Sequence, residues 1–383
     1  MISVFFTTAK YQTPLSEVSS LIVRGFYQGY EYFADQPYDY GGRVVNHDEV
    51  SSRWVGGEVQ FNTQWRDAHK LMLGLEYQYD DRIQLVNYDF EPYALYQNSN
   101  RQGHRVEAYL QDDIQLLDNL IFSAGARLDY HHMLKKLQLN PKLGLIWMPR
   151  SDLTLKALYS STFRAPNAWE RDYQAGANNA ANPNNYEELY KSYEAVAEWR
   201  PQSDLKITGN FFVNDIEQML EQEAYPVIGV YGPFVNIDNY QIYGFEAEIE
   251  KRWDDGRMFK LSYTFNKMND LEGQDQWAQG SPQHLAKLHY SQPLFKRSVS
   301  LGLENIFISE RKTQQHGIAQ AYDLINVNLT TQRLWPGLQA SVGVYNLLDN
   351  HYEMLGGAGF YDIIPDKLPM NGREFRLKLQ FTF

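Results

Sequence analysis

The C-terminal stretch Arg373-Glu374-Phe375-Arg376-Leu377-Lys378-Leu379-Gln380-Phe381-Thr382-Phe383 alternates polar and apolar residues without a break. Strict alternation predicts a β-strand with one apolar and one wet face, because successive side chains of a strand point to opposite faces. The same period of two appears at residues 259–266, 205–211 and 338–345. Helical spacing of apolar residues is hardly found, so the sequence predicts an all-β protein.

The alternation predicts sixteen strands in all, with residues 2–8 as a further, damaged one. Many of these strands are longer than the about five or six residues usual in soluble proteins. A tilted strand that crosses a bilayer needs about 9–11 residues. The predicted strands are 18–33, 52–64, 69–82, 103–115, 118–131, 137–149, 152–163, 188–200, 203–218, 234–251, 257–268, 283–291, 296–310, 322–333, 337–347 and 371–383.

Composition excludes several other classes of protein. The chain has 383 residues, a formal net charge of −12 at pH 7 and no Cys. A disulfide scaffold is therefore excluded, and the lack of a Lys/Arg cluster argues against any nucleic-acid partner. No window approaches the ~20 apolar residues that a membrane-spanning helix needs. The 28 Tyr and 20 Phe argue against disorder.

The connections between the predicted strands alternate in length from residue 34 onward. Long connections are 34–51, 83–102, 164–187, 219–233, 269–282, 311–321 and 348–370, short ones are 65–68, 116–117, 150–151, 201–202, 252–256, 292–295 and 334–336, and only 132–136 breaks the rule. Long loops at one rim and tight turns at the other are typical of an outer-membrane barrel. In hydrocarbon only a closed barrel pairs every backbone N–H and C=O of such strands. The predicted fold class is therefore all-β, an antiparallel up-and-down transmembrane β-barrel.

Six short motifs follow one another in the region 104–383. They are Ser160-Ser161-Thr162-Phe163-Arg164-Ala165-Pro166; Asn182-Pro183-Asn184 with Glu187-Glu188-Leu189-Tyr190-Lys191-Ser192-Tyr193-Glu194; Arg200-Pro201; Asn214-Asp215-Ile216; Asn236 to Glu246; and Tyr345-Asn346-Leu347-Leu348-Asp349 with the strand that ends at Phe383. In this order they resemble the "GFRAP", "NP…PE-x-S-x-S-x-E", "YRP", "YNDI", "GxE" and C-terminal marks of TonB-dependent receptors. These receptors are gated transporters of Gram-negative outer membranes.

The resemblance implies a partial barrel in the cell outer membrane of a Gram-negative bacterium. The family's barrel has about 22 strands, and its plug domain, TonB box and signal peptide are not recognisable in this sequence. We therefore interpret residues 1–383 as a single, partial barrel domain without a plug. The expected partners are outer-membrane lipid, a small-molecule chelate, TonB only through the missing plug, and the barrel-assembly machinery through the strand ending at Phe383. No cofactor is expected.

Ligand recognition in such a barrel would come from aromatic side chains in the long loops and from the lumen wall. Glu246, Glu248 and Glu250 alternate with Phe245, Ala247 and Ile249, so the sequence predicts that the three carboxylates face the lumen. A hydrated wall and a contact for basic residues of a plug are both compatible with them. The aromatic candidates are Tyr93, Tyr96, Trp169, Tyr173, Tyr186, Tyr225, Tyr231, Trp277 and Tyr361, with interfacial girdle or loop packing as the alternative role.

Three other groups of polar residues were weighed as sites. The pair His131-His132 has no further ligands at a spacing typical of a metal site, so an exposed structural role at the rim is favoured and no metal is predicted. Asp270, Glu272 and Asp275 share one predicted loop and are candidate Ca²⁺ ligands, although a solvated acidic loop is favoured. Arg164, at the end of strand 152–163, is expected to anchor the loop that follows it.

The function favoured is the barrel part of a receptor for a scarce chelate, such as a ferric siderophore, haem or cobalamin. A passive sixteen-stranded porin and a non-functional truncated fragment are the alternatives. An enzyme is not expected, because no GxSxG elbow, HExxH motif or Walker A loop occurs. On the plug-less interpretation the chain alone would form a wide, weakly selective pore.

The alternation of connection lengths generates a prediction of topology. The tight turns, such as 150–151 and 201–202, should face the periplasm, and the long connections 164–187 and 348–370 should face outward. Protease applied to intact cells should therefore cut only the long connections. Cleavage at the tight turns would contradict this topology.

Overall fold

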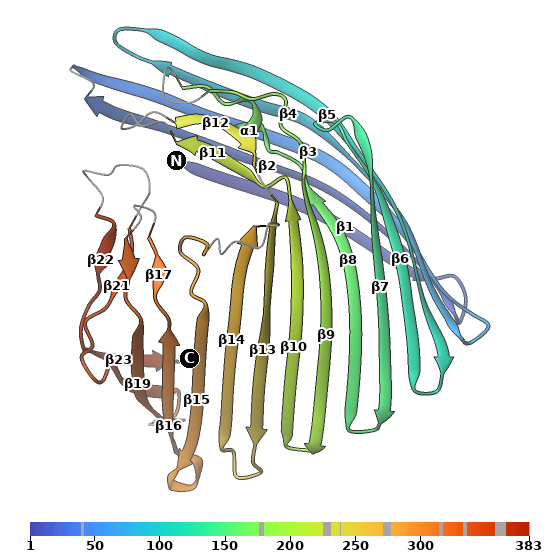
Figure 1. Cartoon of the computed structure of the whole chain (residues 1–383), viewed down its shortest axis with the longest axis vertical. Helices are drawn as coiled ribbons and strands as arrows, with labels where there is room; N and C mark the ends of the chain where they lie inside the picture. Colours follow the sequence, from blue (N-terminus) through green and yellow to red (C-terminus); the bar gives the residue numbers. More distant parts are fainter. Residues whose placement is uncertain are drawn as a thin grey trace. The chain divides into compact units, whose positions relative to one another are not determined.

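The computed structural model describes residues 1–39, 42–175, 180–224, 231–237, 239–270, 277–313, 317–331, 335–356 and 365–382. They form almost only strands (Figure 1). The strands are β1 (Ile2–Pro14), β2 (Ser19–Asp39), β3 (Arg43–Trp65), β4 (His69–Asp89), β5 (Ala94–Leu117), β6 (Leu120–His131), β7 (Lys136–Arg150), β8 (Leu153–Arg164), β9 (Glu188–Gln202), β10 (Leu205–Glu217), β11 (Leu220–Ala224), β12 (Tyr231–Asn236), β13 (Tyr240–Arg252), β14 (Met258–Asp270), β15 (His284–Leu294), β16 (Val299–Ile308), β17 (Arg311–Lys312), β18 (Ile318–Ala319), β19 (Tyr322–Thr331), β20 (Leu338–Tyr345), β21 (Glu353–Leu355), β22 (Lys367–Pro369) and β23 (Glu374–Phe381). The helices are α1 (Ala168–Asp172) and the 3₁₀ turn η1 (Phe295–Arg297). No described helix is long and apolar enough to cross a membrane.

The chain divides into two compact units. Unit 1 comprises Met1–Leu145, Leu158–Ser192 and Asp215–Asn239, and unit 2 comprises Ile146–Ala157, Tyr193–Asn214 and Tyr240–Phe383. The division falls inside β7, β8, β9 and β10, which contribute to both units.

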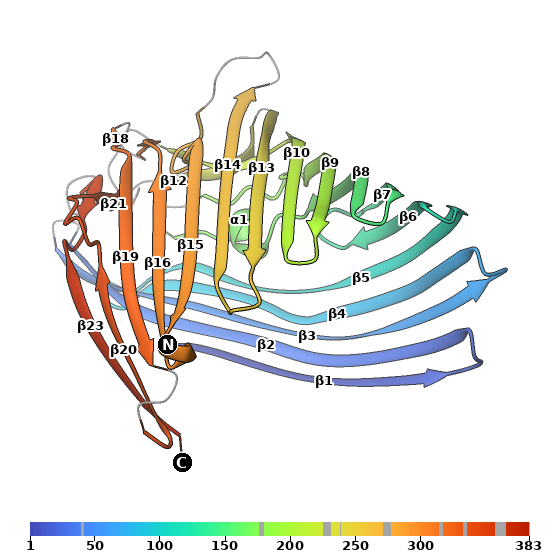
Figure 2. The same cartoon turned by 90° about the horizontal axis from the view of Figure 1, so that it is seen from below.

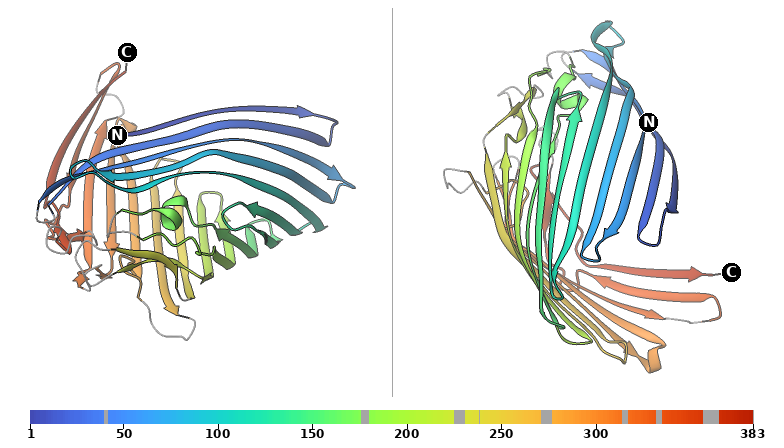
Figure 3. Two further views of the ribbon diagram at one scale, coloured as in Figure 1. Left: turned by 90° about the horizontal axis from the view of Figure 1, so that it is seen from above. Right: turned by 90° about the vertical axis from the view of Figure 1, so that its right-hand side faces the viewer.

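In unit 1 the strands β1 to β6 form an antiparallel meander in which each strand pairs with the next along the chain. Figure 2 shows β1 to β5 side by side as long ribbons, and Figure 3 shows their curvature. β3 has 23 residues and β5 has 24, about twice what a bilayer crossing needs. About half of each ribbon is therefore available to extend beyond a membrane.

One face of the unit 1 sheet is apolar and exposed. Val59, Leu75 and Leu128 lie on this face and are 48%, 56% and 41% exposed, and Val59 is the register partner of Leu75. Aromatic residues border the face at two levels. Trp65 lies at the end near the tight turn, and Tyr77 lies further up, with its hydroxyl 2.7 Å from Nδ1 of His104. We call this face the apolar face of unit 1.

In unit 2 the strands β13, β14, β15, β16, β19, β20 and β23 pair in this order, all antiparallel. Short hairpins occupy parts of the predicted long connections in this unit. β17 pairs with β18 between β16 and β19, and β21 pairs with β22 between β20 and β23. In unit 1 the hairpin β11–β12 takes the corresponding place between β10 and β13.

The sixteen predicted strands all occur, and β1 adds a seventeenth to the main sheet. The prediction that the first strand is damaged was wrong. β1 is an intact strand of 13 residues that pairs with β2 from Ile2 opposite Tyr32 to Pro14 opposite Ser20. The predicted strand 234–251 was also wrong at its start, because residues 234–236 belong to β12 and β13 begins only at Tyr240.

Two predicted long loops, 34–51 and 83–102, were wrong as well. β2 and β3 stay paired up to Asp39 opposite Arg43, and β4 and β5 up to Asp89 opposite Ala94. The main-chain hydrogen bonds of the ladder continue through these segments, but polar and apolar residues do not alternate strictly along them. Periodicity of side chains cannot detect such a ribbon.

The exposed apolar face generates a prediction of stability. Leu75→Arg places a cation in the middle of this face, and in a lipid bilayer it should lower the free energy of unfolding by about 2–4 kcal/mol. Leu95→Arg is the matched control, because Leu95 is similarly exposed, 52% against 56%, but lies near the far end of the β4–β5 ribbon. Urea unfolding from phosphatidylcholine vesicles measures both. Equal effects of the two substitutions would contradict the expectation that this face meets lipid.

Candidate functional site

A row of charged side chains crosses the opposite, polar face of unit 1. Glu58 on β3 is opposite Glu76 on β4, Glu76 is opposite Glu107 on β5, and Glu107 is opposite Asp129 on β6. Arg24 on β2 is opposite Glu58 and begins the row. Like charges directly opposite each other on adjacent strands are destabilising, so this row needs cations.

Two arginines supply the cations, and each serves two carboxylates. Arg24 lies 3.1 Å from Glu58 and 3.6 Å from Glu76. Arg127 forms an ion pair with Glu107, and its Nε donates to Oδ1 of Asp129 at 2.7 Å. The second carboxylate oxygen of Asp129 accepts from the amide of Asn140 at 3.0 Å. Counting only these carboxylates and arginines, the row keeps a charge of −2 (two positive and four negative charges).

Tyr109 reaches Glu58 of this row because Gly74, which has no side chain, leaves room for its ring. A Cβ at Gly74 would lie 2.0 Å from Cζ of Tyr109. The ring reaches across β4 from β5, and its hydroxyl donates to Glu58 at 2.7 Å and lies 3.2 Å from Oε1 of Gln60. A side chain at position 74 would therefore remove the arrangement.

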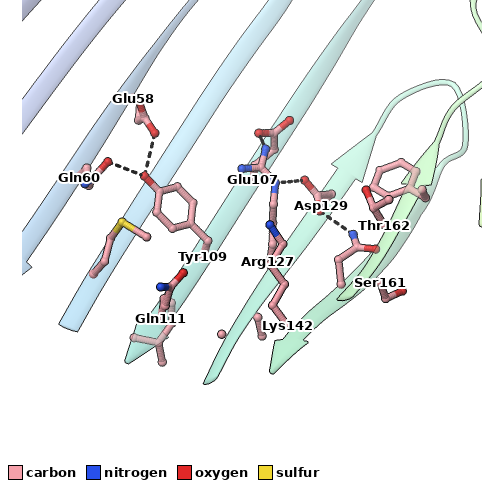
Figure 4. A pocket seen from close by; sticks show the side chains of 16 residues that line it. Glu58, Gln60, Glu107, Tyr109, Gln111, Arg127, Asp129, Lys142, Ser161 and Thr162 are labelled. Atoms are coloured by element: carbon pink, nitrogen blue, oxygen red, sulfur yellow. Dashed lines mark hydrogen bonds and ion pairs between the residues drawn. The ribbon is translucent and has the colours of Figure 1, made fainter. Parts of the chain in front are cut away.

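A cleft of about 550 Å³ opens on this row, lined from β3, β4, β5, β6, β7 and β8. Figure 4 shows Tyr109 directed toward Glu58 and Gln60, with Arg127 beside Asp129. Carboxylates, amides, a phenol and Lys142 offer hydrogen bonds and charge to a polar ligand. Among the described residues, no group of three or more His, Cys, Asp and Glu is arranged to hold a metal ion.

A second polar cluster joins α1 to the outer part of the β3–β4–β5 ribbon. The hydroxyl of Tyr173 donates to Oδ1 of Asp48 at 2.9 Å and accepts from the amide of Asn87 at 3.0 Å. Arg101 pairs with Asp172 at 2.8 Å. Burial raises the pKa of the Asp172 carboxyl, and the charge of Arg101 opposes that shift. Burial, followed by the nearby Asp48, also raises the pKa of Tyr173 well above its ordinary value.

The predicted loop aromatics do not form one group in the part of the chain that the structure describes. Trp169 and Tyr173 lie at α1, with ring centroids 5.9 Å apart, and Tyr173 is buried in the cluster above. Tyr96 lies within β5 and donates to Asp89. Tyr93, at the β4–β5 turn, and Tyr186, before β9, are exposed.

The remaining aromatic candidates belong elsewhere. Trp277 is in unit 2, where its indole N–H donates to the carbonyl oxygen of Ser281. Tyr225 and Tyr361 lie outside the described residues, as do Glu272 and Asp275. The side chains of Tyr231 and Asp270 are likewise not among those described. The role of the aromatic candidates in ligand binding stays a prediction.

The predicted wall carboxylates lie on β13 in unit 2. Glu248 pairs with Lys260 at 2.9 Å, and Glu250 pairs with Arg252. Glu246 is exposed and opposite Thr264. These neighbours are polar, as a wet face requires, while the lumen assignment stays a prediction.

Arg164 makes the contacts of an anchoring residue. Its guanidinium binds Glu170 of α1 at 2.8 and 2.9 Å and also pairs with Glu188 at the start of β9. Glu188 in turn accepts from the backbone N–H of Leu220 at 2.7 Å. Arg164 thus joins β8, α1, β9 and β11, which agrees with the role expected from its motif.

Sequence reasoning missed the charged row. The alternation in Glu58-Val59-Gln60 and Arg127-Leu128-Asp129 was available as a signal. It shows which residues share a face of one strand, but the row exists only through the register between strands.

The family model described as TonB dependent receptor-like, beta-barrel matches residues 5–347. The chain belongs to this family, whose members are transport receptors of Gram-negative outer membranes.

Solved structures of the same fold are distant in sequence. The copper transporter OprC superposes with a TM-score of 0.78 at 15% identity, over 99% of this chain and 65% of that chain. A mutant of the ferric enterobactin receptor PfeA from Pseudomonas aeruginosa gives 0.74 at 16%, over 100% and 62%. The ferric-catecholate import receptor Fiu from E. coli K12 gives 0.71 at 16%, over 100% and 64%. The chain thus spans less than two-thirds of the length of each. A search of curated protein sequences finds no match.

The packing of the Tyr109 ring over Gly74 generates a prediction. Gly74→Val forces the ring away from Glu58 and should lower the free energy of unfolding by about 1–3 kcal/mol, the usual cost of overpacking. Gly25→Val on β2 is the matched control, because a Cβ there meets nothing within 4 Å. It should change stability by less than about 0.5 kcal/mol. Unfolding in urea measures both, and a Gly74→Val variant as stable as Gly25→Val would contradict the role given to Gly74.

Proposed function

We propose that this chain forms the barrel wall of an outer-membrane receptor that takes up a scarce metal or metal chelate. The observation that carries the proposal is a sheet of the TonB-dependent receptor family with one exposed apolar face and one charged face. The apolar face suits contact with lipid, and the polar face suits a water-filled lumen.

The substrate class within this proposal is a metal chelate of the ferric siderophore, haem or cobalamin kind, or a metal ion itself. Support comes from the structural neighbours, which are described as a copper transporter and receptors for ferric enterobactin and ferric catecholates. The cleft beside the charged row offers carboxylates and hydrogen-bond donors that such a polar ligand can use. Energised uptake would also involve TonB, and it belongs to the proposal for the whole receptor.

The alternative is a passive porin-like channel. A porin conducts ions without saturable binding of a particular solute, whereas a receptor binds its ligand specifically. The family match over residues 5–347 favours the receptor. The two functions differ in a measurable property of the full chain.

Binding to the full chain folded in detergent tests the proposal. The ligands are radiolabelled ferric enterobactin, a synthetic ferric catecholate, copper, haem and cobalamin. We expect saturable binding of one of them, weakened at least about tenfold by the Glu58→Gln, Glu107→Gln double variant, because the loss of even one hydrogen bond to a charged group costs about 1.5–3 kcal/mol. Glu17→Gln, at an exposed turn, is the control. Saturable binding of none of the five, with ion conductance in planar bilayers, would favour the porin instead.

A further inference from the structure

Two histidines at the end of β6 form a half-buried stacked pair, so the expectation that they are exposed was wrong. The rings of His131 and His132 are 5.0 Å apart and 15° from parallel. The His132 ring occupies the space above Gly103 of β5, where a Cβ would lie 2.1 Å from it. Both ring nitrogens of His132 are buried without a hydrogen-bond partner. A buried polar group left in this way needs an explanation.

The pair is connected to α1 through Met133. The backbone N–H of Met133 donates to Nδ1 of His131 at 3.2 Å, so that nitrogen acts as an acceptor and carries no proton. The carbonyl oxygen of Met133 accepts from the guanidinium of Arg171 in α1. The same residue thus holds both the imidazole and the helix.

Charged groups surround the pair on each packed element. On β4, Asp80 lies 3.7 Å from Nδ1 of His132, but it is already paired with Arg105 of β5 at 2.9 Å. Arg105 is the register partner of His131. On β5, the carbonyl oxygen of His104 accepts from the His132 backbone N–H. α1 contributes Arg171 and Asp172, and Asp172 pairs with Arg101 of β5. A proton on the pair would therefore lie near the positive charges of Arg105 and Arg171, and the carboxylate of Asp80 is already paired with Arg105.

We propose that His131 and His132 are a proton-operated latch that releases α1 from unit 1 at acidic pH. A proton on Nδ1 of His131 turns the acceptor of the Met133 N–H into a donor, so two donors face each other. The new positive charge also repels Arg171. Both changes weaken the contact that holds α1 to the turn after β6. The inference stands apart from the proposed function, because it concerns only contacts within unit 1.

The pH window follows from the electrostatics. Burial, together with the charges of Arg105 and a protonated His132, lowers the pKa of His131 from 6.5 to about 4. Burial likewise lowers the pKa of His132. At the histidine pair the docked state therefore binds fewer protons than the released state, so the pair's contribution to docking is complete above about pH 6.5 and is lost as the pH falls toward 4. The Asp172 carboxyl, whose pKa burial raises, acts in the opposite direction.

Release would uncover polar groups that α1 now buries. Asn87 has no exposed surface, and it lies beneath the Tyr173 hydroxyl together with Asp48. The amide of Gln97 donates to the carbonyl oxygen of Asp172 at 2.8 Å. Acidification would open this part of the β3–β4–β5 ribbon to solvent.

The chain contains no Cys, so two introduced cysteines can be labelled selectively. Spin labels at Gln174→Cys, exposed just beyond α1, and Val106→Cys, 39% exposed on β5, report the distance between α1 and the sheet. Pulsed electron paramagnetic resonance on the full chain in detergent should show one distance at pH 7.5. A second, longer distance should grow as the pH falls. Counting His131 alone, with a pKa of 6.5 in the released state and about 4 in the docked state, the released-to-docked ratio should rise by more than about tenfold between pH 7.5 and pH 4.5.

Three variants decide the matter. The His131→Asn, His132→Asn double variant keeps side-chain hydrogen-bonding groups but removes both imidazoles, so its longer distance should grow far less between pH 7.5 and pH 4.5 than that of the parent. His69→Asn, on β4 beside Asp112, is the matched control and should respond as the parent does. Arg171→Gln loses the guanidinium that holds Met133 and should show the longer distance already at pH 7.5. Far-UV circular dichroism at each pH should show unchanged strand content.

The proposal is overturned if the parent keeps a single distance down to pH 4. It is also overturned if the histidine double variant responds to pH as strongly as the parent, or if His69→Asn abolishes the response. A loss of strand signal that accompanies the longer distance would mean general unfolding and would overturn it as well. Should the histidine double variant fail to fold, Arg171→Gln remains decisive, because a single docked distance at pH 7.5 would contradict the latch.

Discussion

Main-chain pairing between neighbouring strands is the constraint on which the rest of this structure depends. In unit 1 every strand from β1 to β6 is paired with the next, and side chains alternate between the two faces. Pairing of the backbone makes an apolar face such as that of Leu75 compatible with hydrocarbon, because the regular stretches of the ladder pair the N–H and C=O groups beneath it. The same alternation places every charged residue of the row on the other face. The exposed apolar face and the charged face are thus two results of one geometry.

The fold was largely predictable from the sequence because the alternation is carried by single strands. The C-terminal strand, for example, was recognised from Phe375, Leu377, Leu379 and Phe381, which share one face of β23. Where polar and apolar residues do not alternate strictly, no such signal exists. That is why the outer ends of β2 to β5 were predicted as loops, and why β1, with the consecutive apolar residues Val4, Phe5 and Phe6, was taken for a damaged strand.

The candidate site was less predictable because it depends on register and on packing between distant segments. Glu58 and Asp129 are 71 positions apart and belong to one row only because β3, β4, β5 and β6 pair as they do (129 − 58 = 71). The position of the Tyr109 ring depends on Gly74, which is its register partner on β4 but lies far from it in sequence. Tyr173 was singled out as a possible ligand contact, yet its hydroxyl is engaged by Asp48 and Asn87 inside the protein. A Tyr in a loop looks the same in sequence whether it meets solvent or a buried carboxylate.

The paired outer ribbons limit how such a protein can change in length during evolution. A single residue inserted into β3 or β4 would move every following side chain to the opposite face. Deletions and insertions there should therefore come in twos, or be matched on both arms of a hairpin. The register shifts at Arg53/Trp54 and between Asp80 and Ile83 show the exception, since a bulge absorbs an odd residue locally. Descendants of this chain can lengthen or shorten the ribbons freely at their tips. Within the paired part, changes of an even number of residues keep each side chain on its face of the sheet.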